Sequence, residues 1–117
     1  MEIKVTIKKE YYPNGELLCE TPYKDDKING IAKRYYPDGK LEREIPFENG
    51  KINGIVKEYY ENGKLEWETP YENGEINGIT KEYYKDGELK SETSYINGEK
   101  DGVEKNMNII MNMMKKI

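Results

Sequence analysis

Short runs of alternating apolar and polar residues, separated by turn signals, make up most of the sequence. Residues 65–71 read LEWETPY, in which Leu, Trp, Thr and Tyr alternate with Glu, Glu and Pro. Successive side chains of a strand point to opposite faces, so this alternation predicts a strand. Residues 55–60, IVKEYY, are rich in β-branched and aromatic residues and are too short for a helix that buries one face. The pattern therefore predicts an all-β protein.

The same pattern recurs with a fixed period of 24 residues, in copies at 7–30, 31–54, 55–78 and 79–102. A fixed period is the signature of a repeat architecture. Each copy supplies two strands and two tight turns. We therefore expect an elongated single-layer antiparallel meander of stacked β-hairpins. We assign residues 1–117 to a single repeat domain whose C-terminal cap is 103–117.

One turn in each copy is marked by Asn-Gly, at 49–50, 73–74 and 97–98. Asn-Gly between alternating runs predicts a two-residue type I′ turn, because both of its central residues need positive φ. Asp25-Asp26 stands at this place in the first copy, and we expect a less regular turn there.

The Asn49-Gly50 turn also sets the pairing of the strands on either side of it. It predicts that Glu48 lies opposite Lys51, Phe47 opposite Ile52 and Ile45 opposite Gly54. Gly54 would leave room for a neighbouring aromatic ring to cover bare backbone.

The other turn is typified by Pro37-Asp38-Gly39. A three-residue loop with a bulge would place Tyr35 on the face of Leu41, whereas a four-residue loop would place Tyr36 there. We favour the four-residue loop, because it agrees with the parity that the Asn-Gly turn imposes.

The two ends depart from the repeat. Glu2–Tyr12 predicts one long strand that leaves an open edge. Met107, Ile110, Met111 and Met114 fall at i, i+3, i+4 and i+7, which favours a helix capping the last strand, with a short strand as the alternative. A further interpretation is that residues 103–117 descend from a frameshifted fifth copy.

Composition agrees with a thin sheet: 35% of residues are hydrophobic, 36% are charged, and 11 are tyrosines. Tyrosine suits a half-buried surface, because its ring packs while its hydroxyl stays hydrated. The formal net charge of −4 argues against a nucleic-acid-binding protein and weakens the case for binding anionic lipid.

The sequence contains no catalytic or metal-binding set. Histidine is absent, Cys19 is the single cysteine, and the glycines recur at turn positions. Four glutamates at one repeat offset would lie roughly 9–10 Å apart on alternate strands, too far to share a cation. We expect them to form a solvated charged face with cross-strand lysines: Glu20, Glu44, Glu68 and Glu92. We therefore expect no enzyme, no metal and no cofactor.

One inward row changes between copies while the scaffold positions stay fixed: Cys19, Arg43, Trp67 and Ser91. A row that varies on a constant scaffold is where repeat proteins commonly encode their choice of partner. Trp67 and Tyr71 are the expected anchors, because aromatic residues dominate binding hot spots. The alternative is that the row follows the twist and local packing of the sheet.

At the level of one copy the sequence resembles the MORN repeats (membrane occupation and recognition nexus), particularly their bacterial variant class. Trp67-x-Thr69-x-Tyr71-x-x-Gly74-x-x-x-Gly78 follows the family's Tyr-x-Gly-x-Trp-x-x-Gly-x-x-x-Gly, and Tyr36-Pro37-Asp38-Gly39 matches its turn. The central Gly of the motif is Thr69 here, and its Trp is Tyr71.

The resemblance implies an extended twisted sheet of stacked hairpins that acts as a scaffold, dimerisation module or membrane tether. It thus implies a non-catalytic protein-interaction module, of which a bacterial antitoxin or immunity protein is one form. The alternative that it implies is a peripheral module that associates with phospholipid membranes.

Met1–Glu10 has no signal-peptide pattern and no stretch is long enough to span a bilayer. We expect a cytoplasmic protein, unless a leader has been trimmed from the sequence. We also expect an unidentified protein partner, no nucleic acid, weak membrane association at most, and either a monomer or a weak homodimer.

Overall fold

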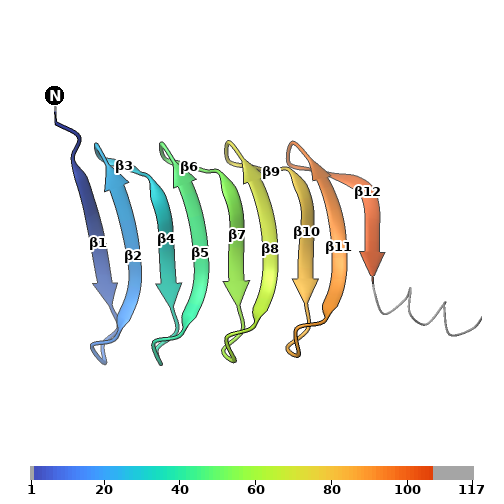
Figure 1. Cartoon of the computed structure of the whole chain (residues 1–117), viewed down its shortest axis with the longest axis horizontal. Helices are drawn as coiled ribbons and strands as arrows, with labels where there is room; N and C mark the ends of the chain where they lie inside the picture. Colours follow the sequence, from blue (N-terminus) through green and yellow to red (C-terminus); the bar gives the residue numbers. More distant parts are fainter. Residues whose placement is uncertain (1, 107–117) are drawn as a thin grey trace, which may run out of the picture.

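The computed structural model describes residues 2–106, and the side chains of residues 2–100. The described chain forms one open antiparallel sheet in which each long strand pairs with the next long strand along the chain (Figure 1). The path through the sheet is β1 (Val5–Tyr11), β2 (Leu17–Lys24), β4 (Gly30–Tyr35), β5 (Leu41–Glu48), β7 (Gly54–Tyr59), β8 (Leu65–Glu72), β10 (Gly78–Tyr83), β11 (Leu89–Ile96) and β12 (Glu99–Asn106). Three two-residue strands lie off this path, β3 (Lys27–Ile28), β6 (Lys51–Ile52) and β9 (Glu75–Ile76).

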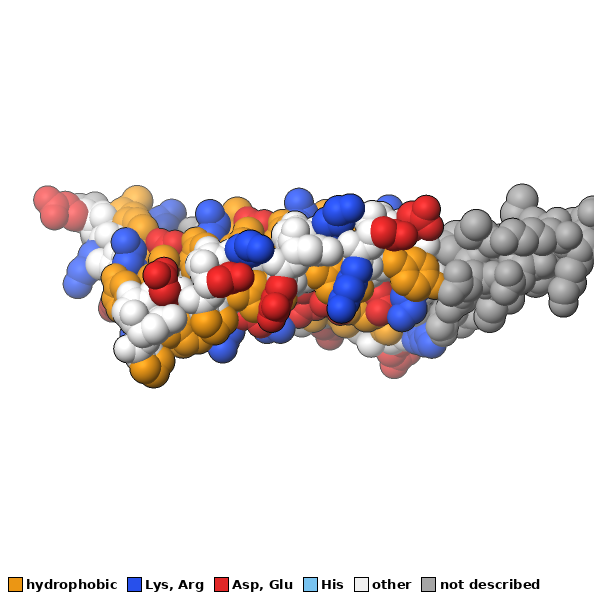
Figure 2. Space-filling view, turned by 90° about the horizontal axis from the view of Figure 1, so that it is seen from below, with side chains coloured by type: hydrophobic (Ala, Val, Ile, Leu, Met, Phe, Trp, Pro, Cys, Tyr) orange, Lys and Arg blue, Asp and Glu red, His pale blue; other side chains and the backbone are white. Residues whose placement is uncertain are grey.

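The sheet is a single layer, and Figure 2 shows the described part edge-on as a thin slab. Among the described side chains, Val56 and Thr80 are the most buried, with exposed fractions of 9% and 6%. All of β1 is exposed, and most positions in the middle of the other described strands are half-buried. The predicted all-β, elongated, single-layer meander is confirmed, and its packing runs across neighbouring strands instead of between two layers.

The Asn-Gly turns form as predicted. Asn49 and Gly50 have φ values of 49° and 84°, and Glu48 and Phe47 lie opposite Lys51 and Ile52. The expectation of a less regular turn at Asp25-Asp26 was wrong, since these residues have φ values of 49° and 67°. Aspartate tolerates left-handed backbone better than most residues, so the first copy closes its hairpin in the same way.

The preference for a four-residue loop after Tyr36 was also wrong. The Gly39 N–H donates to the Tyr36 carbonyl (2.9 Å) and the Tyr36 N–H donates to the Lys40 carbonyl (2.7 Å), which closes a three-residue loop. Tyr35 therefore lies opposite Leu41. Gly39, with φ of 94°, supplies the left-handed residue that this loop needs.

A bulge restores the alternation of faces that the Asn-Gly turn imposes, which was the reason for favouring the longer loop. Tyr35 pairs with Leu41 but Arg34 pairs with Arg43, so β5 carries one extra residue, Glu42. The inward row therefore keeps its face although the loop is shorter than expected.

The predicted pairing of Ile45 with Gly54 was wrong as well. The register shifts by two residues after the turn, so that Arg43 lies opposite Glu58 and Gly54 pairs with Tyr71 on the next strand. A proline, not an aromatic ring, covers the glycine: a Cβ on Gly54 would lie 2.9 Å from Cγ of Pro46. Gly30 and Gly78 lie under Pro22 and Pro70 in the same way.

In the second and third copies, both tyrosines of the Tyr-Tyr pair join neighbouring copies. The second tyrosine donates its hydroxyl to a backbone carbonyl of the next copy, as Tyr60 does to Tyr83 (2.6 Å). The first tyrosine donates to a glutamate of the preceding copy. These bonds run from Tyr35 to Glu20 (2.8 Å), from Tyr59 to Glu44 (2.6 Å) and from Tyr83 to Glu68 (2.5 Å).

The two ends are partly as expected. The N-terminal strand begins at Val5 instead of Glu2, and it forms one edge of the sheet. The start of the fifth copy is a strand within β12, paired with β11. The predicted helix or strand formed by residues 107–117 lies outside the described residues.

Candidate partner-binding face

The register places the four varying residues in one line across one face of the sheet. Arg43 lies opposite Glu58, which lies opposite Trp67, which lies opposite Glu82. The complete line, called the variable row below, is Glu10, Cys19, Arg34, Arg43, Glu58, Trp67, Glu82 and Ser91.

Half of the variable row was missed by the sequence analysis. Glu10, Arg34, Glu58 and Glu82 each precede a Tyr-Tyr pair; three of them are glutamate, and Arg34 is the exception. That difference was visible in the sequence, but the face on which these residues lie depends on the Glu42 bulge and could not be assigned without it.

Charged contacts link neighbours within the variable row and close to it. Arg43 Nη2 lies 2.8 Å from Glu58 Oε1, and Arg34 Nε lies 3.1 Å from Glu42 Oε2. Towards the ends of the row, the Cys19 thiol and the Ser91 hydroxyl each lie 3.5 Å from a glutamate oxygen. Arg34 and Arg43 stand directly opposite one another, which concentrates positive charge at this point of an otherwise acidic row.

Tyr71 lies on the same face but not in the variable row. It pairs with Ile76 and with Gly54, four strand residues away from Trp67. With Tyr23, Phe47 and Tyr95 it forms a separate line, called the aromatic row below. The aromatic row is almost the same in every copy, so we assign Tyr71 to the repeated scaffold and not to the residues that vary between copies.

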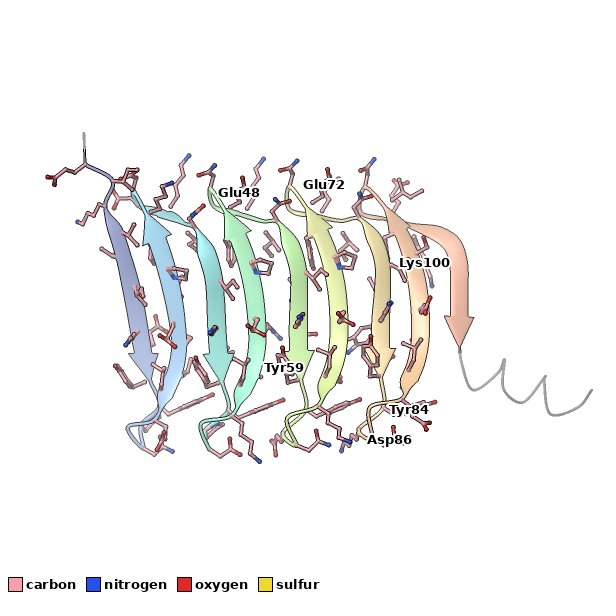
Figure 3. All side chains as sticks on the ribbon, viewed as in Figure 1. Glu48, Tyr59, Glu72, Tyr84, Asp86 and Lys100 are labelled. Carbon is pink, nitrogen blue, oxygen red and sulfur yellow. The ribbon has the colours of Figure 1, made fainter. Side chains whose placement is uncertain are left out.

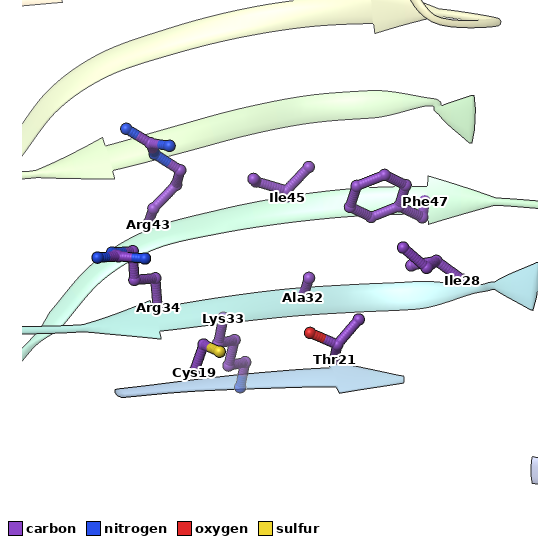
Figure 4. Close-up of a pocket in the computed structure, with 9 residues that line it drawn as sticks. All are labelled: Cys19, Thr21, Ile28, Ala32, Lys33, Arg34, Arg43, Ile45 and Phe47. Carbon is purple, nitrogen blue, oxygen red and sulfur yellow. The ribbon is translucent and has the colours of Figure 1, made fainter. Parts of the chain in front are cut away.

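Between these two rows lies a hollow of about 240 Å³. Figure 4 shows Arg34 and Arg43 at one end of the hollow, Ile28 and Phe47 at the other, and Ala32 between them. Ala32 occupies the place that Val56 and Thr80 fill in the next two copies. The hollow therefore follows from one small residue in a repeated position.

The opposite face carries the predicted charged ladder. Each of the four glutamates lies opposite a lysine on both sides, as Glu44 does with Lys33 and Lys57. Beside the ladder runs a line of isoleucines, called the isoleucine stripe below. Its members and their exposed fractions are Ile7 59%, Ile31 52%, Ile55 49% and Ile79 50%.

The tyrosines that touch the ladder are held in their neutral form. Burial, followed by the hydrogen bond to Glu44 and the charge of that carboxylate, raises the pKa of Tyr59 to about 12. The same causes raise the pKa of Tyr35 and Tyr83 to about 12. These hydroxyls therefore act as hydrogen-bond donors between copies.

Cys19 has the surroundings of a packing residue. Burial, and then its contact with Glu10, raise the pKa of the thiol above its usual value. A raised pKa keeps the sulfur protonated, whereas a reactive cysteine needs the thiolate. Among the described side chains, those of residues 2–100, no group of Cys, Asp and Glu is arranged to hold a metal ion. The same residues contain no helix with the length and apolar character to cross a membrane.

Comparison with protein families gives one match. The model described as a MORN repeat variant matches residues 4–25, 28–49, 52–73 and 76–97, which together make up well over half of the chain. The matches keep the period of 24 residues and begin three residues before each copy defined above. No protein with a curated description matches the chain.

Proposed function

Because this chain belongs to the MORN repeat variant family, we propose that it is a non-catalytic module that binds a protein partner through its variable row. Repeats of this family are often interaction or membrane-binding modules. The observation that supports the proposal is that the residues of the variable row differ between copies, whereas the contacts of the scaffold repeat from copy to copy.

The scaffold repeats its contacts from copy to copy. The backbone N–H groups of Asn49, Asn73 and Asn97 each donate to the side-chain oxygen of an asparagine in the preceding copy, at 3.1–3.2 Å. Across the same copies the variable row presents a thiol, a guanidinium, an indole and a hydroxyl. Such a surface offers a different chemical group at each step along a rigid frame, which suits recognition of one extended partner.

Trp67 is the expected centre of this surface. It lies between Glu58 and Glu82, with Thr69 beside it on the same strand and face. A large aromatic side chain with charged neighbours has the make-up of a binding hot spot, since tryptophan supplies apolar area and the charges surround it. We expect the partner to cover Trp67 together with the adjacent glutamates.

The proposal is tested by exchanging the row without disturbing the scaffold. Trp67→Ser inserts the residue that the fourth copy already carries at this place, Ser91, so the sheet should fold. Tagged wild-type chain should capture a protein from a lysate of its native host, and Trp67→Ser should lose it. Ile55→Thr, on the opposite face, is the matched control and should retain it. Equal capture by all three chains, or capture of no protein by the wild type, would overturn the proposal.

An antitoxin or immunity role is the specific form of this proposal that the family resemblance suggests. The captured partner should then slow growth when it is expressed alone, and co-expression of the wild-type chain should restore growth. Co-expression of Trp67→Ser should not. If the partner does not slow growth when it is expressed alone, the antitoxin role is contradicted, and the proposal of a protein-binding module still stands.

A second candidate function is peripheral membrane association, and the isoleucine stripe favours it. Four exposed isoleucines lie beside a row that contains lysines, which is an arrangement that can insert side chains at a membrane surface. The glutamates between those lysines and the net charge of −4 weaken it.

Sedimentation with anionic liposomes at low and high salt tests this second function. Binding should weaken with salt and fall in the Ile55→Ser variant, and deletion of residues 107–117 should remove any contribution of the Met- and Ile-rich tail. An intact chain that stays in the supernatant at low salt would end this alternative.

A further inference from the structure

The hollow over Ala32, on the face that carries the variable row, has two arginines at one end and apolar side chains at the other. We propose that it binds an extended segment of the protein partner with the pattern acidic residue, any residue, apolar residue, so that the carboxylate meets Arg34 and Arg43 and the apolar side chain fills the space over Ala32. This inference rests on the proposed function and names the chemistry of the partner segment.

The charge of the hollow comes from the two arginines. They lie directly opposite one another on β4 and β5, and their side chains are 50% and 42% exposed. Like charges directly opposite one another in a sheet are unfavourable. Each guanidinium has five N–H donors, and the contacts with Glu42 and Glu58 engage one nitrogen of each. A carboxylate placed between the two side chains would relieve the repulsion and receive charge-assisted hydrogen bonds.

The apolar part begins one step further along the strands. Ala32 and Ile45, which pair directly, lie two residues from the arginines, and Phe47 lies two residues beyond Ile45. Side chains two apart on a strand share a face at a spacing of roughly 6.6 Å. An extended partner segment has this same spacing, so an acidic side chain over the arginines would place the second residue after it over Ala32.

The hollow has room for an apolar side chain of the partner. Its volume is about 240 Å³, and Ile28 and Phe47 form the wall at its apolar end. Val56 and Thr80 fill the equivalent space in the next two copies, and Glu58 and Glu82 replace Arg34 there. The first two copies are therefore the part of the array where this sequence pattern would be recognised.

The chain supplies its own variants for the test. Ala32→Val and Arg34→Glu insert residues that the third copy carries at the same places, Val56 and Glu58, so the sheet should tolerate both. The reverse change Val56→Ala opens a similar hollow in the third copy beside Glu58 and without an arginine pair, and it serves as the matched control. Circular dichroism verifies that each variant is folded.

The probe is the fluorescein-labelled peptide Ser-Glu-Ser-Leu-Ser-Leu-Ser with both ends blocked, measured by fluorescence anisotropy at low salt. A second peptide carries Lys in place of Glu. We expect the wild type to prefer the Glu peptide, with affinity reduced about tenfold by Arg34→Glu and at least about threefold by Ala32→Val. Val56→Ala should bind as the wild type does. Arg34→Glu should gain affinity for the Lys peptide.

Several results would overturn the inference. These are no binding of the Glu peptide, equal binding of the two peptides by the wild type, and binding of the Glu peptide that is unchanged in Ala32→Val and Arg34→Glu. Partner capture that still depends on Trp67 would show in each case that the protein-binding function stands and that this hollow is not its specificity pocket. Absence of peptide binding together with absence of Trp67-dependent partner capture would contradict the proposed protein-binding function as well.

Discussion

Gly54 and Gly50 both have positive φ, but their surroundings differ. Gly50 stands at the tip of a turn with no atom within 4 Å of an added Cβ, whereas an added Cβ on Gly54 would lie 2.9 Å from Pro46 Cγ. The requirement for glycine at position 50 is therefore conformational, and at position 54 it is both conformational and steric. The sequence alone does not distinguish the surroundings of the two glycines. The difference arises from the two-residue register shift that brings Pro46 over Gly54.

We expect Gly54→Ala to destabilise the chain by about 3 kcal/mol and Gly50→Ala by about 1 kcal/mol, because only the first adds a clash to the backbone strain. Urea unfolding followed by circular dichroism measures both. Pro46→Ser inserts the residue found at this place in the fourth copy, Ser94, and in the Gly54→Ala background it should recover part of the loss. Equal losses for the two glycine variants would contradict the steric argument.

The Tyr59 hydroxyl gives the fold a dependence on alkaline pH. Folding raises the pKa of this tyrosine from 10 to about 12, so the folded chain holds the proton more tightly than the unfolded chain does. The resulting contribution to the free energy of unfolding is complete below pH 10 and is lost as the pH rises towards 12. Stability should therefore fall across this range, with Tyr35 and Tyr83 acting in the same direction.

Tyr59→Phe should lower stability at pH 8, because it removes the bond to Glu44, and should make the fall above pH 10 shallower. Thermal unfolding at a series of pH values measures both effects. Tyr11→Phe, at the equivalent place in the first copy, is the control, since no earlier copy supplies a glutamate there and the side chain is 59% exposed. A parallel fall in Tyr59→Phe and wild type would show that other groups cause it.

At the scale of the strand and turn, much of the structure could be predicted. Alternation identified the strands, and Asn49-Gly50 identified its turn and the first two pairs beyond it. The irregularities could not be predicted, because a bulge at Glu42 and a register shift at Asn53 depend on which backbone groups find partners across the sheet. The Asn53 N–H, for example, donates to the Pro46 carbonyl at 3.0 Å. This limited the prediction of the candidate site most, because the bulge determines the face of the sheet on which Arg34 lies.

The Asp25-Asp26 turn carries strain that its counterparts avoid. Asp26 has φ of 67° at a place where the other copies have glycine. We expect Asp26→Gly to stabilise the chain by about 1 kcal/mol, because a left-handed conformation costs glycine little. Gly50→Asp, the reverse change in the second copy, should destabilise it by a similar amount. Urea unfolding measures the pair, and changes of the same sign would refute this explanation.

At the scale of the whole molecule, β1 leaves an open edge of the sheet, and such an edge is a usual site for self-association. Val5 and Ile7 are exposed there by 68% and 59%, beside the lysines of the same strand. Edge lysines oppose pairing between sheets, and four copies exceed the roughly three that a repeat array needs to be stable alone. We therefore predict a monomer.

Light scattering coupled to size-exclusion chromatography, at several concentrations, measures the mass. We expect 13.7 kDa throughout. A mass near twice this value that persists on dilution would establish a dimer. Val5→Lys would then show whether the β1 edge forms it, since an added charge on that edge should return the mass to that of one chain.

The tyrosine bonds between copies have a consequence for how such a gene can change. The first tyrosine of a pair donates to a glutamate of the preceding copy, and the second donates to a backbone carbonyl of the next copy. Figure 3 shows the side chains in a similar arrangement from one copy to the next. Removal of residues 55–78 would join Gly54 to Ile79, and the Tyr36 hydroxyl would meet the Tyr83 carbonyl in place of that of Tyr59. Unequal recombination can thus lengthen or shorten the protein by whole copies while the tyrosine hydrogen bonds between copies are retained. The hollow over Ala32, built within the first two copies, would be inherited intact while the length of the surface beyond it changed.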